Sequence, residues 1–222
     1  MTETTSLSEK FRARRDLFLR ELIARLPRRD GTLRIVDVGG RSQYWRRVGL
    51  PFLREQGVRI DLVNLYASEF EQNDAESDIF NFVVGDACKL DIADAAYDLY
   101  HSNSVIEHVG QWGSMTAFAR EAQRVAAHHY VQTPNYWFPV DPHFAKLPGQ
   151  QWLPHPLRAR LMMALPLATA GRAKDLDTAY RFVDSSILLT TAQMRLLFPG
   201  SEIRFERVAG LKKSIIAVSR GA

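Results

Sequence analysis

Residues 33–45 constrain the fold of this chain more than any other stretch, because they have the pattern of a buried strand that ends in a tight turn. Four of the six residues from Leu33 to Val38 are aliphatic, which is typical of a strand covered on both faces. Asp37 and the pair Gly39-Gly40 then interrupt the run, as expected where a strand turns into a loop or helix. Ligands bind at this end of the strands in open α/β sheets, and glycine lets a ligand approach the backbone. We therefore expect a binding site after this strand.

Three further segments repeat the pattern of an apolar strand followed by polar residues. They are residues 58–65, which contain Asn64, residues 80–84, which precede Gly85-Asp86, and residues 97–102, which precede Asn103. Four polar strand ends at one edge of a sheet favour a nucleoside pocket. Periodicity and capping residues also predict the remaining elements, which are helices at about 6–26, 114–125 and 190–198 and strands at 128–132, 202–209 and 212–219.

With these motifs the chain resembles the class I S-adenosylmethionine-dependent methyltransferases, in particular their small single-domain bacterial group. The resemblance rests on the Gly-Gly turn followed by Tyr44-Trp45, and on residues 98–109, where an acid opens the fourth strand and Glu107-His108-Val109 closes the next loop. It implies an α/β fold with a Rossmann-like doubly wound sheet of seven strands, mostly parallel with an antiparallel last strand, and helices on both faces. We expect a single domain over residues 1–222, with an N-terminal helix at about 6–26 and a helical cap insertion at about 135–185.

The same resemblance implies S-adenosyl-L-methionine as the cofactor. Asp37 and Gly39 would meet its methionine half, Asn64 stands where the family has an acid for the ribose hydroxyls, and Asp86 would accept from the adenine amine. The residues predicted to bind the cofactor are Asp37, Gly39, Gly40, Asn64, Leu65, Asp86, Ala87, Ser102 and Asn103. An alternative for Asp86 is a residue that merely caps a turn.

The chain departs from the family at two cofactor positions. Many members carry three glycines at alternate positions after the acid, whereas here Arg41 and Gln43 occupy the second and third. Asn64 lacks the charge-assisted hydrogen bonds of the usual carboxylate, so we expect weaker affinity or help from Asp61. These departures also favour an alternative function, a cofactor-binding protein of the same fold without catalysis.

Two histidines are candidates for the acceptor side of the site. His143 lies in the aromatic loop 133–144, which three prolines stiffen and which has the composition of a substrate wall. His108 closes the loop after the fourth strand. A hydroxyl acceptor requires a base, and we expect His143 first and His108 second as catalytic residues. The alternative is that His143 is only a loop residue bonded to backbone.

A divalent metal is a further alternative at this loop. Some ubiquinone-pathway O-methyltransferases and small-RNA 2′-O-methyltransferases look similar here, with Glu-x-x-Glu-His holding a divalent cation, sometimes joined by a later histidine. In this chain Ser104 stands in place of the first glutamate, which leaves Glu107, His108 and His143. Because hard cations prefer several carboxylate oxygens, we expect no metal.

Charge and composition limit the kinds of molecule that this chain is expected to bind. The net charge of +4 is small, so we expect a small-molecule substrate and no nucleic acid. The single Cys88 and the lack of a long apolar span predict a cytoplasmic protein without an integral membrane segment, although the apolar run 161–167 allows weak contact with a membrane surface. By analogy with relatives, the expected reaction is methyl transfer to a hydroxyl of a sugar or other polyhydroxylated metabolite, with an N or C acceptor as the alternative.

Overall fold

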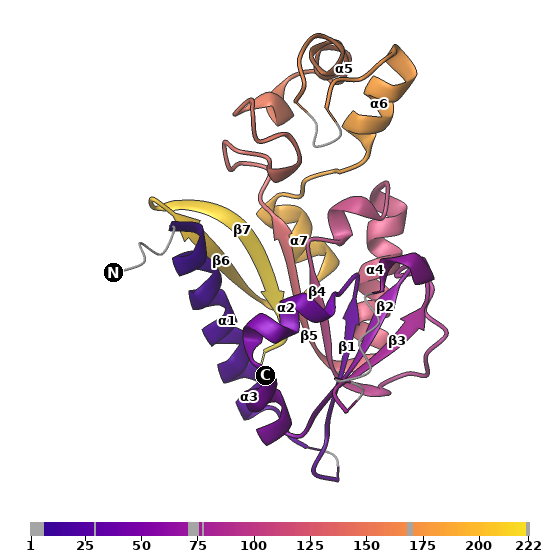
Figure 1. Ribbon diagram of the computed structural model, residues 1–222, viewed down its shortest axis with the longest axis vertical. Helices are drawn as coiled ribbons and strands as arrows, with labels where there is room; N and C mark the ends of the chain where they lie inside the picture. Colours follow the sequence, from indigo (N-terminus) through magenta and orange to yellow (C-terminus); the bar gives the residue numbers. More distant parts are fainter. Residues whose placement is uncertain (1–6, 29, 71–75, 77, 168–170, 221–222) are drawn as a thin grey trace.

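The computed structural model describes residues 7–28, 30–70, 76, 78–167 and 171–220, with side chains from residue 15 onward (Figure 1). Within these ranges the strands form one seven-stranded sheet in the order β3-β2-β1-β4-β5-β7-β6. The first five strands pair in parallel, and β7 runs antiparallel to both β5 and β6. This confirms the predicted seven-stranded sheet. The strands are β1 (Leu33–Val38), β2 (Val58–Asn64), β3 (Phe80–Val84), β4 (Tyr97–Asn103), β5 (Ala126–Pro134), β6 (Glu202–Val208) and β7 (Leu211–Val218).

The described helices surround the sheet or lie in the segment between β5 and β7. They are α1 (Leu7–Arg25), α2 (Ser42–Val48), α3 (Leu50–Glu55), α4 (Trp112–Arg124), α5 (His155–Ala164), α6 (Leu176–Asp184) and α7 (Thr191–Leu197). Ser6, where the sequence predicts that the first helix begins, lies outside the described residues, whereas α7 begins with a capping box between Thr190 and Gln193. None of the helices in the described ranges has a stretch long and apolar enough to cross a lipid bilayer.

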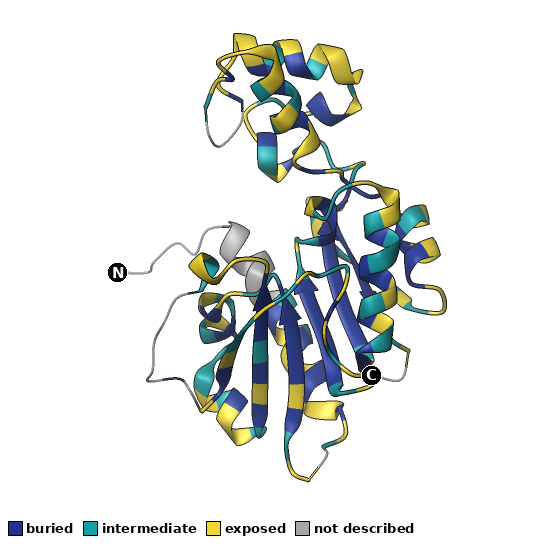
Figure 2. Ribbon diagram, turned by 90° about the vertical axis from the view of Figure 1, so that its right-hand side faces the viewer, coloured by how far each residue is buried: buried dark blue, intermediate teal, exposed yellow. Residues whose placement is uncertain are grey.

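Alternation along the buried strands creates a hydrophobic core on each face of the sheet. In β1, Ile35 packs with residues of α1, α2 and α3, whereas its neighbour Val36 packs with residues of α4 and α7. Leu19 and Ile23 of α1 are fully buried in the core that contains Ile35, so this helix covers one face of the sheet. Figure 2 shows the central strands as buried between the two helical layers.

The strand order reverses between β1 and β4, and this reversal fixes where a ligand can bind. The chain leaves β1 to build β2 and β3 on one side, then returns to place β4 on the other. The crossovers therefore diverge at the carboxyl ends of β1 and β4, which leaves a crevice there. Asp37 of β1 lies opposite His101 of β4 in this register.

Residues 135–189 form a lobe beyond this edge of the sheet (Figures 1 and 2). Its helices α5 and α6 pack on each other around a small core of their own, which includes Phe144, Met162 and Val183. Two short 3-10 helices precede them, η4 (Pro142–Phe144) and η5 (Gln150–Trp152). The lobe coincides with the segment for which the sequence predicts a cap, and that function stays a prediction.

Candidate active site

A pocket of about 440 Å³ opens at the carboxyl ends of the central strands. Its volume is in the range of small-molecule sites. It is lined by Val38, Gly39, Val63, Asn64, Leu65, Glu69, Gly85, Asp86, Ala87, Cys88, Val105, His108, Val109 and Ser114. Five predicted cofactor residues and one predicted catalytic histidine thus face a single cavity. Among the described residues that line it, none comes from the lobe.

The two glycines after β1 are required by the packing of the turn itself. Gly39 has a φ of +73°, and a Cβ there would lie 2.3 Å from Val105 Cγ2. A Cβ on Gly40 would lie 1.8 Å from Asp37 Oδ2. Side chains of the protein therefore fill the space that each glycine leaves. We expected the missing Cβ atoms to admit a ligand, and the structure gives a different reason for them.

Asp37 supports this turn from the interior of the protein. Its side chain is 1% exposed, with Oδ2 accepting a hydrogen bond from Trp45 Nε1 at 2.6 Å and Oδ1 lying 2.6 Å from His101 Nδ1. Trp45 and His101 are buried as well. Both carboxylate oxygens are thus engaged with protein groups, and Asp37 is absent from the pocket lining.

Asn64, at the end of β2, is bonded to the glycine turn that follows β1. Its Nδ2 donates to the carbonyl of Gly40 at 2.9 Å. Leu65 follows it and is 52% exposed. The predicted helper Asp61 faces elsewhere, since its carboxylate accepts from the Tyr97 hydroxyl and lines a separate cavity. Glu69, from the short helix η1 (Ala67–Glu69), lines the same pocket as Asn64 and Leu65.

Asp86 forms a tight turn after β3. Its Oδ1 accepts from the backbone N–H of Cys88 at 2.8 Å, and its carbonyl accepts from that of Lys89 at 2.9 Å. This is the turn-forming role that the sequence left open as the alternative. The residue is nevertheless exposed and lines the pocket together with Ala87. One carboxylate oxygen can therefore hold the turn while the other faces the cavity.

Ser102 and Asn103, at the end of β4, lie outside the pocket lining. Ser102 is fully buried, and its Oγ donates to the carbonyl of Val38 at 2.9 Å, which ties β4 to β1 beneath the site. Asn103 accepts from the Ser104 hydroxyl at 3.4 Å. Ser104 has a φ of +60°, so the chain bends sharply as it leaves the strand. This bend leads directly into the loop that carries Glu107 and His108.

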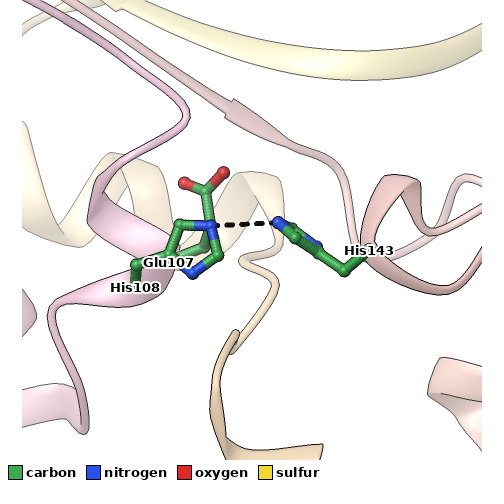
Figure 3. Close-up of side chains that lie close together, drawn as sticks. All are labelled: Glu107, His108 and His143. Carbon is green, nitrogen blue, oxygen red and sulfur yellow. Dashed lines mark hydrogen bonds between the residues drawn. The ribbon is translucent and has the colours of Figure 1, made fainter. Parts of the chain in front are cut away.

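His108 and His143 meet beside the pocket (Figure 3). His108 ends the 3-10 helix η3 (Ile106–His108), and His143 lies in η4, at the entry to the lobe. Their Nε2 atoms are 3.0 Å apart. The Nδ1 of His108 lies 2.6 Å from the carbonyl oxygen of Ser185, and that of His143 lies 2.8 Å from Asp141 Oδ1. Each ring is therefore held by a hydrogen-bond acceptor on the side away from the other.

Glu107 is the third member of this cluster. Glu107, His108 and His143 each offer one atom that could bind a metal, and these three atoms lie within 4.8 Å of one another. Glu107 is 1% exposed, its Oε2 accepts from the Thr133 hydroxyl at 2.9 Å, and its Oε1 is buried without a hydrogen-bond partner among the described residues. Burial raises the pKa of Glu107 to about 7 and lowers that of His108.

Asp141 orients the imidazole ring of His143. It is 1% exposed, and its Oδ1 accepts from both the backbone N–H and the Nδ1 of His143. Its Oδ2 accepts from Gln150 Nε2 at 3.0 Å. The aromatic loop thus places a buried aspartate directly behind the histidine, so His143 is more than a loop residue bonded to backbone.

Comparisons with known proteins agree with this architecture. Residues 37–129 match the family model described as "Methyltransferase domain". The matched segment, residues 37–129, thus carries a methyltransferase domain of the class I S-adenosylmethionine-dependent type. Among curated proteins, no match was found.

Solved structures that resemble the methyltransferase domain do so at low sequence identity. The CMeT domain of citrinin polyketide synthase aligns over 94% of this chain and 51% of its own, with a TM-score of 0.58 and 11% identity. The small RNA methyltransferase HEN1 aligns over 98% and 26%, with 0.55 and 14%. A candidate O-methyltransferase from Nostoc punctiforme aligns over 96% and 58%, with 0.52 and 12%. The chain therefore spans only part of the length of each, and the likeness concerns the fold.

The pocket of the methyltransferase domain fits S-adenosylmethionine, the cofactor of this family. The cavity offers a carboxylate at Asp86, an amide and a carboxylate at Asn64 and Glu69, and apolar walls at Val63, Val105 and Val109. A nucleoside needs this mixture of apolar surface for the base and a few polar groups for its edges.

Several residues of the candidate site were not found by the sequence analysis. Glu69, Cys88 and Ser114 line the pocket, but they lie in a short 3-10 helix, in a turn and near the start of α4, with no motif around them. His101 was missed because only the register of β1 and β4 brings it to Asp37. Asp141 could have been found, since an aspartate two residues before a histidine can reach that ring locally.

Proposed function

We propose that this chain transfers a methyl group from S-adenosylmethionine to a hydroxyl of a small polyhydroxylated acceptor such as a sugar. The observation that carries the proposal is the pocket at the carboxyl ends of β1 to β4, which opens beside the pair His108 and His143. The match of residues 37–129 to a methyltransferase domain supports S-adenosylmethionine as the cofactor. A hydroxyl acceptor is supported by an aspartate-bound histidine, which is equipped to take a proton.

We assign the cofactor contacts to the residues that line the pocket. Asn64 and Glu69 would hold the ribose hydroxyls, Asp86 and Ala87 the adenine edge, and Gly39 the methionine half. Asp37, Gly40, Ser102 and Asn103 would act from behind, by holding the turn and the end of β4 in place. When bound, S-adenosylmethionine supplies an electrophilic methyl group on a positively charged sulfur.

His143 is suited to accept the acceptor's proton. Because Asp141 takes the Nδ1 hydrogen of His143, the Nε2 lone pair stays available. The buried carboxylate would then stabilise the imidazolium that forms. General-base assistance of this kind accelerates a reaction by about 10²- to 10⁴-fold. His108 would position the same oxygen, since it lies both in the pocket lining and 3.0 Å from His143.

The lobe would supply the acceptor's binding surface. Its aromatic loop carries Trp137, which is 64% exposed, and the adjacent Trp152 is 44% exposed, with their ring centroids 6.5 Å apart. Exposed aromatic faces of this kind are frequent at binding sites. They lie in the same segment as His143, so an acceptor that contacts them could present a hydroxyl to the histidines.

Calorimetric titration with S-adenosylmethionine and its demethylated product tests the first half of the proposal. The second half is tested by transfer of an isotopically labelled methyl group to a panel of sugars and polyols. We expect both ligands to bind to the wild type and to bind more weakly to Asp86→Ala. We also expect the labelled methyl group to appear on a hydroxyl of an acceptor. Lack of binding would overturn the cofactor assignment. Binding without transfer to any acceptor would instead favour a non-catalytic cofactor-binding protein.

A further inference from the structure

The cluster of Glu107, His108 and His143 has a property that a catalytic base alone does not explain. Figure 3 shows the two imidazole rings directed at each other, with the glutamate beside them. The ligand atoms come from two separate segments, η3 after β4 and η4 at the entry to the lobe. Their close approach is therefore imposed by the tertiary structure.

The hydrogen-bond partners fix where the hydrogens of the two rings lie. A carbonyl oxygen only accepts hydrogen bonds, so the Nδ1 of His108, at 2.6 Å from Ser185, must carry a hydrogen. The carboxylate of Asp141 likewise takes the Nδ1 hydrogen of His143 at 2.8 Å. In the neutral rings both Nε2 atoms then present lone pairs to each other at 3.0 Å. Such a contact is repulsive unless a cation lies between the two nitrogens.

Glu107 distinguishes the two cations that could lie there. A proton shared between the rings would satisfy His108 and His143 but would leave the buried Oε1 of Glu107 without a partner. A buried carboxylate oxygen without a partner is costly in free energy. A metal ion can be bound by all three groups at once, because its ligands surround it.

We propose that Glu107, His108 and His143 bind one divalent ion of the zinc or transition-metal type through one carboxylate oxygen and two Nε2 atoms. Two imidazoles and one carboxylate suit zinc and neighbouring metals, whereas magnesium and calcium prefer oxygen ligands. Three protein ligands leave one position open. Asp141 and the Ser185 carbonyl hold the outer nitrogens, as second partners of metal-bound histidines commonly do.

The present spacing is close to that of such a site. Nitrogen ligands at about 2.0–2.1 Å from a tetrahedral zinc lie roughly 3.3 Å apart. The two Nε2 atoms, at 3.0 Å, need to separate only slightly. The Glu107 oxygen lies within 4.8 Å of them and has to approach by at most roughly 1.5 Å, which a side-chain rotation can supply.

The consequence for catalysis rests on the proposed function. With an ion bound, the Nε2 lone pairs of both histidines are occupied, so His143 no longer serves as the base. The ion would instead bind an acceptor hydroxyl at its open position, next to the pocket that His108 lines, and lower its pKa, so that the hydroxyl would release its proton to solvent water before its oxygen takes the methyl group. This inference replaces our sequence-based expectation of no metal, which weighed the missing carboxylate at Ser104 but not the histidine geometry.

Metal binding can be measured without any activity assay. The purified chain is stripped with a chelator, dialysed, and titrated separately with Zn²⁺, Co²⁺ and Mg²⁺ by calorimetry, while the visible spectrum of Co²⁺ reports its coordination. We expect one Zn²⁺ or Co²⁺ per chain, much weaker binding of Mg²⁺, and a spectrum with nitrogen ligands at low coordination number. Asp141→Asn should weaken binding by about 10- to 100-fold.

Variants separate this site from adventitious binding by surface histidines. His108→Ala and His143→Ala should abolish the stoichiometric binding, and Glu107→Gln, which conserves shape in the buried position, should weaken it. His155→Ala removes an exposed histidine that pairs with Asp184 outside the cluster, and it should bind like the wild type. Thermal melts establish that each variant is folded. Binding that survives in His108→Ala and His143→Ala, or that His155→Ala loses equally, would overturn the proposal.

Different results would refute the metal site and the proposed function. If the stripped wild-type chain binds neither Zn²⁺ nor Co²⁺ but still binds S-adenosylmethionine and transfers methyl groups, the metal site is refuted and His143 stands as the base. If the ion binds at the predicted residues while S-adenosylmethionine does not bind, the metal site is supported and the proposed function is refuted.

Discussion

Replacing Asp37 by alanine should destabilise the fold. The substitution removes the acceptor of two short hydrogen bonds, from Trp45 Nε1 and His101 Nδ1, both at 2.6 Å. Trp45 is 0% and His101 1% exposed, so water cannot replace the lost acceptor. Leaving a buried donor unsatisfied costs about 1–3 kcal/mol, hence about 2–6 kcal/mol for the two.

The prediction becomes sharp when Asp37→Ala is compared with Asp86→Ala. Asp86 is exposed and gives up only the turn contact to the N–H of Cys88, so its stability loss should stay near 1 kcal/mol. In a chain of this length 1 kcal/mol corresponds to about 2–4 °C in Tm. Asp37→Ala should therefore melt roughly 5–20 °C below the wild type, and Asp86→Ala only a few degrees below it.

Calorimetric titration with S-adenosylmethionine completes the test. Asp86→Ala should bind it roughly ten- to hundredfold more weakly, because it loses a charge-assisted contact. Asp37→Ala should lose affinity as well, but only together with stability, since it acts through the turn. If Asp37→Ala melts with the wild type and binds poorly, its carboxylate touches the cofactor directly and our assignment is refuted.

Three more perturbations test other parts of the structure. In a calorimetric titration, Glu69→Gln should bind S-adenosylmethionine more weakly than the wild type if the carboxylate of Glu69 holds the ribose. An unchanged affinity would show that Glu69 does not contact the cofactor. Gly40→Ala should lower Tm, because its Cβ would lie 1.8 Å from Asp37 Oδ2, whereas Gly113→Ala, with open space around its Cβ, should match or exceed the wild type. Burial lowers the pKa of His129 from 6.5 to about 4, so stability that is fully present above pH 6.5 should fall by about 3 kcal/mol as the pH drops to 4. His129→Gln should flatten that slope in denaturant melts across this pH range, and an unchanged slope would mean that other groups cause it.

The strands were predictable because each is an apolar run between turn residues. β1 and β3 begin and end where the sequence predicted, and the other strands differ by one or two residues at their ends. The helices α2 and α3 were missed. They have seven and six residues and are separated only by Gly49, with Pro51 in the first turn of α3. Two turns of helix are too short for a period of 3.6 residues to be recognised.

The candidate cofactor pocket was predictable as a set of positions, but the contacts that each residue makes were less predictable. Asn64 and Asp86 lie at the pocket because strand ends in a parallel sheet share one edge. The role of Asp37 depended on the register between β1 and β4, which places it opposite His101. Local sequence contains no information on that register. Asp37, which the sequence predicts to meet a ligand, is bonded in the structure to Trp45 and His101 next to the turn after β1.

The histidine cluster depends on tertiary structure in a stronger sense, because both ends of the lobe are needed to form it. His143 enters at one end, held by Asp141. At the other end, the carbonyl of Ser185 orients His108, and the N–H of Ile187 donates to the carbonyl of Glu107 at 2.8 Å. The loop after β4 is thus fixed by the segment that returns from the lobe. Any shift of the lobe would move His143 and release His108 together, so the geometry at the acceptor side and the position of the lobe must change as one.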